Sequence, residues 1–404
     1  MKILFIHQNF PGQFKYLAPA LLKRGHEVRA LSLTGVGVAE VDHTKYAIER
    51  GSTPNIHPWL VDFETQVIRA EGVLKAALKL KSEGYIPDVI VSHSGWGESL
   101  FLKDVWPNVP LGIYCEFFYN VDNSDINFDP EFYSYDPTAY AAISLKNLNN
   151  RLHFAVADAG ISPTNWQKST FPQPFKDRIT VIHEGVDTNL FVPNPHVGLK
   201  LNLDLNLAKG EEVITFVNRN LEPHRGYHSF MRALPKILKE RPRAHVLIVG
   251  GDGVSYGAKH ADGLSWKDVF LQEVASELDL RRVHFLGNVS YDVFLAILQV
   301  SMVHVYLTYP FVLSWSFLEA MSAGCAIVAS KTAPVEEVLT HNQTGRLVNF
   351  FSPEEISSQV IDLINNSNHR EALGGAARQY AIDYFDRETI CLPAQINWVE
   401  RKFI

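Results

Sequence analysis

The sequence predicts an α/β fold made of two Rossmann-like, doubly wound domains that face each other across a cleft. The chain opens with strand, helix and strand patterns over residues 2–33, and the same alternation starts again at Val213 after a Pro- and Asn-rich connection. Its 404 residues are also too many for one ordinary hydrophobic core and suit two domains.

Composition excludes several classes of protein. Hydrophobic residues make up 46% of the chain and charged residues 20%, which is typical of a soluble globular enzyme. The net charge of −7 argues against a nucleic acid partner.

Three scattered cysteines have neither metal-ligand nor disulfide spacing, so we expect a cytoplasmic protein with no metal. No apolar run is long enough to span a membrane, but a basic helix over 64–83 leaves contact with the inner face of the membrane open.

The first half opens with a buried strand at 2–6, a turn with Gly12, a helix over 13–24 and a strand at 28–33. A ligand could approach the backbone at Gly12, although the turn lacks the G-x-G-x-x-G pattern of dinucleotide sites.

Polar residues follow the later strands of the first half. We expect strands at 88–93, 110–117 and 155–161, with His93 ending one strand and Glu116 near the end of another. Because the carboxyl ends of parallel strands share one edge of a sheet, these side chains should lie at that edge. A structural and a functional role for His93 are about equally favoured.

An acidic, aromatic loop covers 122–136. Its alternating side chains from Asp125 to Asp129 resemble the start of a calcium loop, but Pro130 stands where such a loop needs glycine. Asx-turns in a surface loop explain the pattern better, and we expect no metal there.

The second half repeats the strand and helix pattern. The expected strands are 213–218, 245–250 and 283–286, and the expected helices are 227–239 and 266–278. The predicted organisation is a first domain at 1–192, a second at 193–385, and a C-terminal helix at 386–404 that packs back on the first.

The second half also contains candidate anion-binding residues. Arg219 and Arg225 follow a strand and precede a helix, a position that suits a diphosphate, although two solvated arginines are an equal alternative. Residues 304–330 form a strand, a loop and a helix that begins near Ser316. Ser316 and Glu319 have the spacing of a capping box, which is the structural alternative to a ligand at that helix start.

These pieces, in this order, resemble the family-4 glycosyltransferases, which have the GT-B fold. The resemblance covers nearly the whole chain and rests on seven segments in register: 24–28, 184–191, 219–226, 249–253, 283–289, 318–324 and 344–348. It implies a transferase that moves a sugar from a nucleotide-sugar to an acceptor with retention of configuration and without a bound metal or other cofactor.

The resemblance also implies roles for single residues. Catalytic roles fall to His93, Arg219, Arg225 and Glu319, the arginines on the diphosphate and Glu319 on the ribose. Donor binding falls to Gly12, Gly251, Gly287, Asn288, Val289, Leu313, Ser314, Trp315 and Ser316. Glu116 and Asp122 are placed on the acceptor side.

One departure from the family pattern concerns the donor sugar. Phe311 stands where the family usually has a glutamate that contacts sugar hydroxyls, and Val312 replaces the next glycine. The change indicates a different sugar, a contact supplied from elsewhere, or lost activity. His183 and Glu184 also replace the usual Pro-Asn.

The expected function is transfer of a hexose, from a UDP-sugar by preference, to a carbohydrate, lipid-linked or other hydroxyl acceptor in polysaccharide, lipopolysaccharide or glycoconjugate biosynthesis. The alternatives are a nucleotide-sugar epimerase or phosphorylase on the same fold and a non-catalytic nucleotide-sugar-binding protein. A dehydrogenase that uses the turn at 250–253 ranks last, because the third glycine of its motif is missing.

Overall fold

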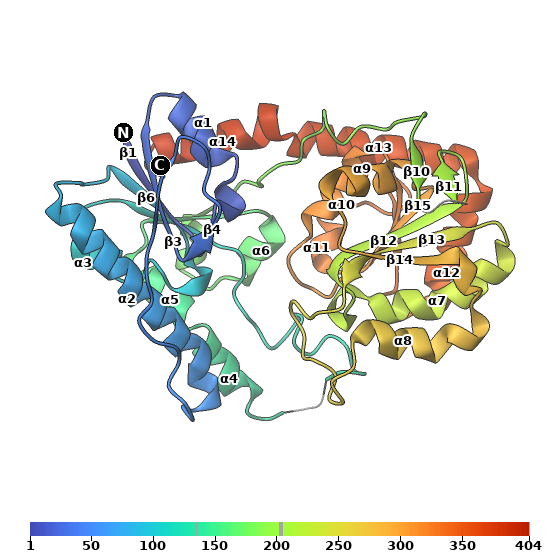
Figure 1. The fold of residues 1–404 in the computed structure, drawn as a ribbon, viewed down its shortest axis with the longest axis horizontal. Coiled ribbons are helices and arrows are strands. Elements are labelled where there is room, and N and C mark those ends of the chain that lie inside the picture. The colour runs from blue at the N-terminus through green and yellow to red at the C-terminus, as the bar shows by residue number, and fades with distance from the viewer. Residues whose placement is uncertain (134–135, 202–204, 404) are drawn as a thin grey trace. The chain divides into compact units, whose positions relative to one another are not determined.

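The computed structural model describes residues 1–133, 136–201 and 205–403. It divides into two compact units (Figure 1). The first unit contains Met1–Glu184 together with Glu388–Ile404, and the second contains Gly185–Arg387. Each unit is built around its own parallel sheet.

The first unit has a seven-stranded parallel sheet in the order β5-β3-β1-β6-β7-β8-β9. Its strands are β1 (Lys2–Ile6), β3 (Glu27–Ser32), β5 (Asp42–Lys45), β6 (Val89–His93), β7 (Leu111–Tyr114), β8 (Ala159–Ser162) and β9 (Ile179–Val181), and a small pair is formed by β2 (Asn9–Phe10) and β4 (Thr34–Gly35). The helices are α1 (Leu17–Lys23), α2 (Val61–Ser82), α3 (Leu102–Val105), α4 (Ala139–Lys146), α5 (Leu148–Val156), α6 (Asn165–Thr170) and α14 (Leu392–Glu400).

Alternate side chains of β1 enter two different cores. Leu4 and Ile6 pack with α2 on one face of the sheet, whereas Ile3 and Phe5 pack with α1 and α14 on the other. A strand that is buried on both faces reads as a continuous apolar run, which is why β1 is recognisable in the sequence.

The second unit has a six-stranded parallel sheet in the order β14-β13-β12-β15-β16-β17. Its strands are β12 (Val213–Asn220), β13 (His245–Gly251), β14 (Val283–Gly287), β15 (Val303–Tyr306), β16 (Ala326–Ser330) and β17 (Arg346–Val348), with a separate hairpin of β10 (Gly198–Lys200) and β11 (Asn206–Ala208). The helices are α7 (Tyr227–Glu240), α8 (Trp266–Val274), α9 (Tyr291–Val300), α10 (Trp315–Ser322), α11 (Ala333–Glu336), α12 (Pro353–Asn365) and α13 (Ser367–Phe385).

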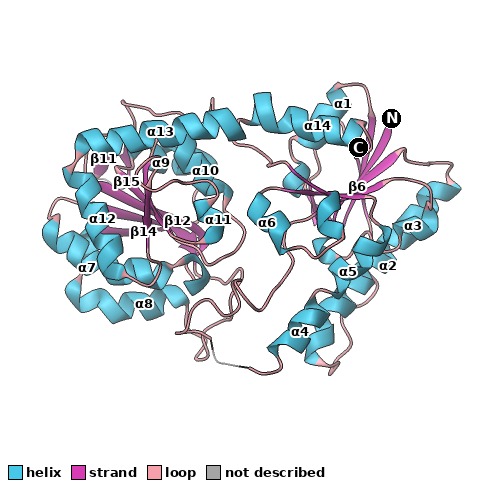
Figure 2. Ribbon diagram, turned by 180° about the vertical axis from the view of Figure 1, so that it is seen from behind, coloured by secondary structure: helices cyan, strands magenta, loops and turns pink. Residues whose placement is uncertain are grey.

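Helices cover both faces of this second sheet (Figure 2). Val213 and Val217 of β12 join the core under α9, α10 and α13, whereas Phe216 stacks on Phe230 of α7 on the opposite face. In both sheets the strand order reverses at the first strand, β1 or β12. The next strand lies on one side of β1 or β12, and a later one, β6 or β15, lies on the other. The crevice at such a switch point is where open α/β sheets bind ligands.

Several boundaries differ from those expected: α1 begins at Leu17 and not at 13, β7 ends at Tyr114 and not at 117, β12 runs to Asn220 and so includes Arg219, and α8 ends at Val274 and not at 278. The first unit ends at Glu184, and the Pro-rich connection belongs to the second unit, where it leads into the β10–β11 hairpin. Ala155 and Val156, expected in a strand, instead end α5, because a short apolar run fits a helix end as well as a strand. The chain crosses between the units twice, and the crossings meet in a bridge between Val186 and Asp386.

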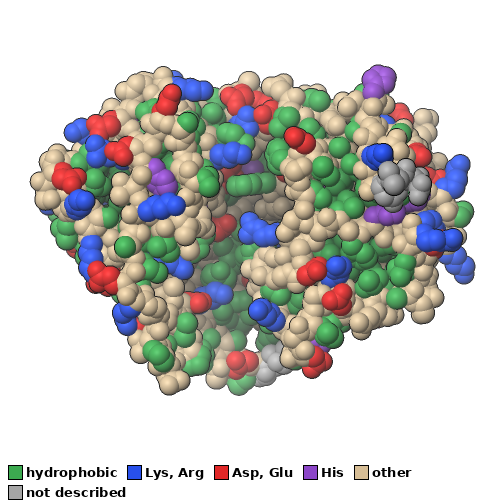
Figure 3. Space-filling view, viewed as in Figure 1, with side chains coloured by type: hydrophobic (Ala, Val, Ile, Leu, Met, Phe, Trp, Pro, Cys, Tyr) green, Lys and Arg blue, Asp and Glu red, His purple; other side chains and the backbone are tan. Residues whose placement is uncertain are grey.

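Blue and red side chains are both scattered over the face seen in Figure 3. No helix among the described residues is long and apolar enough to cross a bilayer.

Candidate functional site

Two histidines lie at the switch point of the first unit. His7 follows β1, and His93 is the last residue of β6. Their ring centroids are 5.3 Å apart, and only 1% of His93 is exposed. The structure thus places His93 at the carboxyl edge of the sheet, together with a histidine that sequence analysis had treated as part of a turn.

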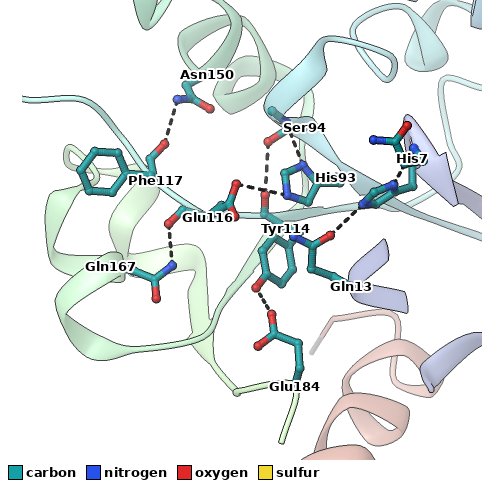
Figure 4. Close-up of polar contacts among 12 residues, drawn as sticks. His7, Gln13, His93, Ser94, Tyr114, Glu116, Phe117, Asn150, Gln167 and Glu184 are labelled. Atoms are coloured by element: carbon teal, nitrogen blue, oxygen red, sulfur yellow. Dashed lines mark hydrogen bonds and ion pairs between the residues drawn. The ribbon is translucent and has the colours of Figure 1, made fainter. Parts of the chain in front are cut away.

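The contacts of His93 determine its tautomer. Its Nδ1 accepts the Gly95 N–H at 3.2 Å, so the neutral ring carries its proton on Nε2. That nitrogen lies 3.6 Å from Glu116 Oε2 (Figure 4). The ring is stacked between Trp96 and Tyr114, with centroids 4.3 and 5.0 Å away. A fixed N–H therefore points toward a carboxylate whose side chain is 42% exposed.

Gly12 is required by the packing of His7. Its φ is +47°, and a Cβ atom there would lie 2.2 Å from the His7 ring. His7 Nδ1 accepts the Asn9 N–H at 2.9 Å, and Nε2 donates to Gln13 Oε1 at 2.7 Å. Burial, with the nearby His93, lowers the pKa of His7 to about 3, so the ring is neutral. The close approach of His7 is a structural reason for glycine at position 12.

One further residue of this edge, Tyr114, was missed by sequence analysis. Tyr114, the last residue of β7, donates its hydroxyl to Glu184 Oε1 (Figure 4). Glu184 is one of the two residues that depart from the family pattern, and its carboxylate is buried. The sequence did not mark Tyr114, because the strand expected there continued to residue 117 and placed Tyr114 inside it. Asp122, by contrast, is exposed and accepts hydrogen bonds from Tyr140 at 2.9 and 3.0 Å.

In the second unit, Arg225 joins the two loops at the switch point. It lies in the loop after β12, is 4% exposed, and donates through Nη1 to Thr308 Oγ1 at 2.7 Å and to the Val312 carbonyl at 3.0 Å. Both acceptors follow β15. The Arg219 side chain is exposed, and among the described residues we find no ion pair for it. One predicted arginine is thus anchored and the other is free to reach a ligand.

Aromatic rings surround the guanidinium of Arg225. The ring centroids of Tyr256 and Phe311 lie 4.9 and 5.9 Å from its Cζ. His224 packs between Tyr309 and Phe311, each 4.8 Å away. Burial, with the adjacent Arg225 charge, holds the pKa of His224 well below its ordinary value. Phe311, which stands where the family usually has a glutamate, is therefore a buried part of the wall beside Arg225.

The loop before α10 is held by a buried tyrosine. The Ser314 N–H donates to the Tyr306 hydroxyl at 2.9 Å, and the Ser314 and Ser316 hydroxyls are 2.8 Å apart. The predicted capping box is wrong: α10 begins at Trp315, Ser314 precedes it, and no side chain of the described residues caps the helix. Leu313 is half-buried and Trp315 is exposed.

Glu319 has a partner that its sequence neighbours could not reveal. Its Oε1 accepts the hydroxyl of Tyr291, the first residue of α9, at 2.6 Å. The turn before α9 contains Gly287, with φ +62°, the exposed Asn288, and Val289. The hydrogen bond between Tyr291 and Glu319 therefore brings the predicted ribose-binding glutamate close to the predicted base-binding turn, which ends two residues before Tyr291.

Gly251 lies where the ends of β12, β13 and β14 meet. A Cβ atom at Gly251 would lie 2.8 Å from Asn220 Oδ1 and 3.4 Å from Asn288 Nδ2. The predicted donor-binding residues Gly251 and Asn288 are therefore neighbours.

Comparison with known proteins identifies the family. The model described as "Glycosyl transferase family 4 group" matches residues 24–191, and the model described as "Glycosyl transferases group 1" matches residues 202–380. The chain belongs to the family-4 glycosyltransferases. The two matched segments fall within the two domains expected from the sequence, 1–192 and 193–385.

Two curated relatives illustrate how far the likeness extends. An uncharacterized glycosyltransferase of Methanocaldococcus jannaschii is 31% identical over 182 residues, which is 44% of this chain and 42% of the relative. A Mycobacterium tuberculosis protein named GDP-mannose-dependent alpha-(1-6)-phosphatidylinositol monomannoside mannosyltransferase is 25% identical over 232 residues, 56% of this chain and 58% of that protein. The chain thus spans about half the length of the curated relatives it matches.

The GT-B fold is also that of solved structures. The crystal structure of Anabaena HepE in complex with UDP has a TM-score of 0.69 and 17% identity, covering 99% of this chain and all of that one. At this identity the likeness establishes the fold of this family-4 member.

Proposed function

We propose that this protein is a retaining glycosyltransferase that moves a hexose from a nucleoside diphosphate sugar, with UDP preferred, to a hydroxyl of a carbohydrate or lipid-linked acceptor in polysaccharide, lipopolysaccharide or glycoconjugate biosynthesis. The observation that carries the proposal is Arg225, a buried guanidinium fixed across the switch point of the second sheet. A fixed cation there suits a group whose negative charge grows during the reaction.

The leaving group explains why a fixed arginine is needed. When the bond between the sugar and the phosphate breaks, the terminal phosphate gains negative charge. Arg225, the exposed Arg219 and the N–H groups at the start of α10 stabilise that charge more in the transition state than in the ground state. Glu319 would bind the ribose hydroxyls, and the turn at 287–289 would bind the base.

The residues of the first unit suit the acceptor and the reacting sugar. The new glycosidic bond would form on the face from which the diphosphate leaves, and the acceptor proton would pass to the departing phosphate. His93 would donate Nε2–H to the sugar, and the exposed Glu116 would orient the acceptor hydroxyl. The proposal requires no bound metal ion. A cytoplasmic setting is supported by three free, buried cysteines.

Calorimetric titration with UDP, GDP and ADP tests the donor site first. GDP is the main rival to UDP, because a relative is named for dependence on GDP-mannose. We expect micromolar binding of one diphosphate by the wild-type protein and binding that is weaker on the order of 10²-fold in Arg225→Ala. Arg282→Ala is a matched control, because Arg282 also donates to backbone carbonyls, at Leu238 and Arg241, but lies before β14. Binding of none of the three would refute the donor site.

Steady-state kinetics test the role of Arg225 in the transition state. We expect Arg225→Ala to lower kcat/KM on the order of 10²-fold, as removal of one preorganised charge-stabilising donor does. Unchanged kinetics would remove Arg225 from the site.

The packing of Phe311 favours a second candidate, a protein that binds a nucleotide-sugar without transferring it. The Phe311 ring supplies no hydrogen bond to a sugar hydroxyl. Such a protein would bind a diphosphate in the titration yet release neither free sugar nor product with any acceptor, whereas an epimerase would change the sugar without an acceptor.

A further inference from the structure

A buried carboxylate holds the glycine-rich loop that follows β13. Glu222 is 0% exposed. Its Oε1 accepts the Ser255 N–H at 3.0 Å, and its Oε2 accepts the N–H groups of Tyr256 and Gly257, both at 3.2 Å. Among the described residues we find no salt bridge to Glu222, so these backbone donors compensate for burial of its charge.

Asn220 provides a second attachment for the same loop. Its Nδ2 donates to Ser255 Oγ at 2.7 Å, and Asn220 and Glu222 both belong to the segment that ends and follows β12. Four hydrogen bonds from one segment therefore fix three consecutive residues of another. These bonds fix part of the long connection, residues 252–265, between β13 and α8.

The attached loop places Tyr256 against Arg225. The Tyr256 ring is 39% exposed, and its centroid lies 4.9 Å from Arg225 Cζ. Thr308 and Val312 hold only Nη1 of the guanidinium, so the ring restrains the orientation of the remaining nitrogens. A half-exposed side chain on a glycine-rich loop would not stay in this position unless its backbone were fixed.

We propose that Glu222 and Tyr256 are positioning residues for Arg225. Glu222 fixes the backbone of the loop, the loop fixes the Tyr256 ring, and the ring holds the guanidinium in the orientation that binds a nucleoside diphosphate. This inference rests on the proposed function and adds to it two residues that act through Arg225.

Three variants separate the steps of this chain of contacts. Glu222→Gln keeps the size of the side chain but turns an NH₂ group toward backbone N–H donors, so the loop loses at least one bond. Tyr256→Ala removes the ring, and Tyr256→Phe keeps it. We expect diphosphate affinity to fall about fivefold to tenfold in the first two variants and less than about twofold in Tyr256→Phe.

Glu212→Gln is the matched control. Glu212 is a buried carboxylate that precedes β12 and is paired with Arg241 and Arg243. We expect this variant to lose stability without losing diphosphate affinity. Melting temperatures of all the variants show how much of any effect is loss of folding.

Titration of double variants provides the decisive measurement. If Tyr256 acts through Arg225, adding Tyr256→Ala to Arg225→Ala leaves the diphosphate affinity unchanged, because the group that the ring positions is gone. The proposal is overturned if Tyr256→Ala lowers the diphosphate affinity by the same factor in Arg225→Ala as in the wild-type protein. It is also overturned if Tyr256→Ala, or a folded Glu222→Gln, binds the diphosphate as tightly as the wild-type protein. If Glu222→Gln does not fold, the Tyr256 series still decides. A wild-type protein that binds no diphosphate refutes the proposed function as well, whereas a wild-type protein that binds while the variants bind equally refutes only this inference.

Discussion

Gly226 shows how a single residue without a side chain determines the position of Arg225. Its φ is +68°, and a Cβ atom there would lie 2.3 Å from Leu307 Cβ, in the loop after β15. Any side chain at this position must push apart the two segments that Arg225 connects. Glycine is thus needed for close approach as well as for backbone conformation.

We expect Gly226→Ala to weaken diphosphate binding at least about tenfold and to lower the free energy of unfolding by about 2–4 kcal/mol. Gly25→Ala is the control: φ is +86° there, but nothing lies within 4 Å of the new Cβ. That variant should lose only about 1 kcal/mol of stability and keep its affinity. Titration and urea unfolding measure both quantities, and equal affinities in the two variants would contradict the expectation.

The arginine itself could be predicted from the sequence, but its environment could not. Arg225 was recognisable because it follows a strand and precedes a glycine and a helix. Its partner Thr308 is 83 residues away, and the partner of Glu319, Tyr291, is 28 residues away. Local spacing instead favoured a capping box between Ser316 and Glu319, but Ser316 is the second residue of α10 and not the residue that precedes the helix.

At the scale of elements, the helix α14 completes a core that β7 leaves open. Gly112 of β7 has no side chain, and a Cβ atom there would lie 2.4 Å from the Phe403 ring and 2.7 Å from that of Trp398. The two rings are 4.3 Å apart, and Trp398 is buried. The end of the chain therefore fills space in the middle of the first sheet.

We expect Trp398→Ala to lower the free energy of unfolding of the first unit by about 3–5 kcal/mol, because it empties a buried site under α14. Glu400 on the same helix pairs with Arg24 at the surface, and Glu400→Gln should cost less than about 1 kcal/mol. Urea denaturation distinguishes the two variants. Similar losses would mean that the ion pair, and not the ring, holds the helix.

Elements with a clear hydrophobic periodicity could be predicted from the sequence, whereas short apolar runs could not be assigned to a helix or a strand. The strand at 2–6 and the helix at 227–239 agree with β1 and α7 within one residue. The run at 155–161 was divided between α5 and β8, since its length fits either structure. Glu222 was not predicted, because nothing local to a buried acid shows which backbone it will bind.

At the scale of the whole molecule, several buried histidines are held neutral. Burial lowers the pKa of His153, His183 and His304 to about 4 in each case, and that of His7 to about 3. These pKa values lie below the ordinary value of 6.5, so the native state binds fewer protons than the unfolded chain. The stability they contribute is complete above pH 6.5 and is lost as the pH falls toward 4.

We therefore expect the urea midpoint to fall between pH 7.5 and pH 5, with about 1–2 kcal/mol lost for each of these histidines at pH 5. His153→Gln should make the dependence shallower, since an amide can keep the bonds to Ser99 and to the Asn149 carbonyl. The exposed His196 serves as control, and His196→Gln should leave the dependence unchanged. A midpoint that is level from pH 7.5 to pH 5 would contradict this expectation.

The bridge between Val186 and Asp386 has a consequence for how such chains diversify. The Val186 N–H donates to the Phe385 carbonyl at 2.8 Å, and the Arg387 N–H donates to the Val186 carbonyl at 2.9 Å. The second unit is thus one continuous segment of the chain whose first and last residues lie side by side. Recombination at these two points would exchange an entire folding module between related genes while the path of the remaining chain stays the same.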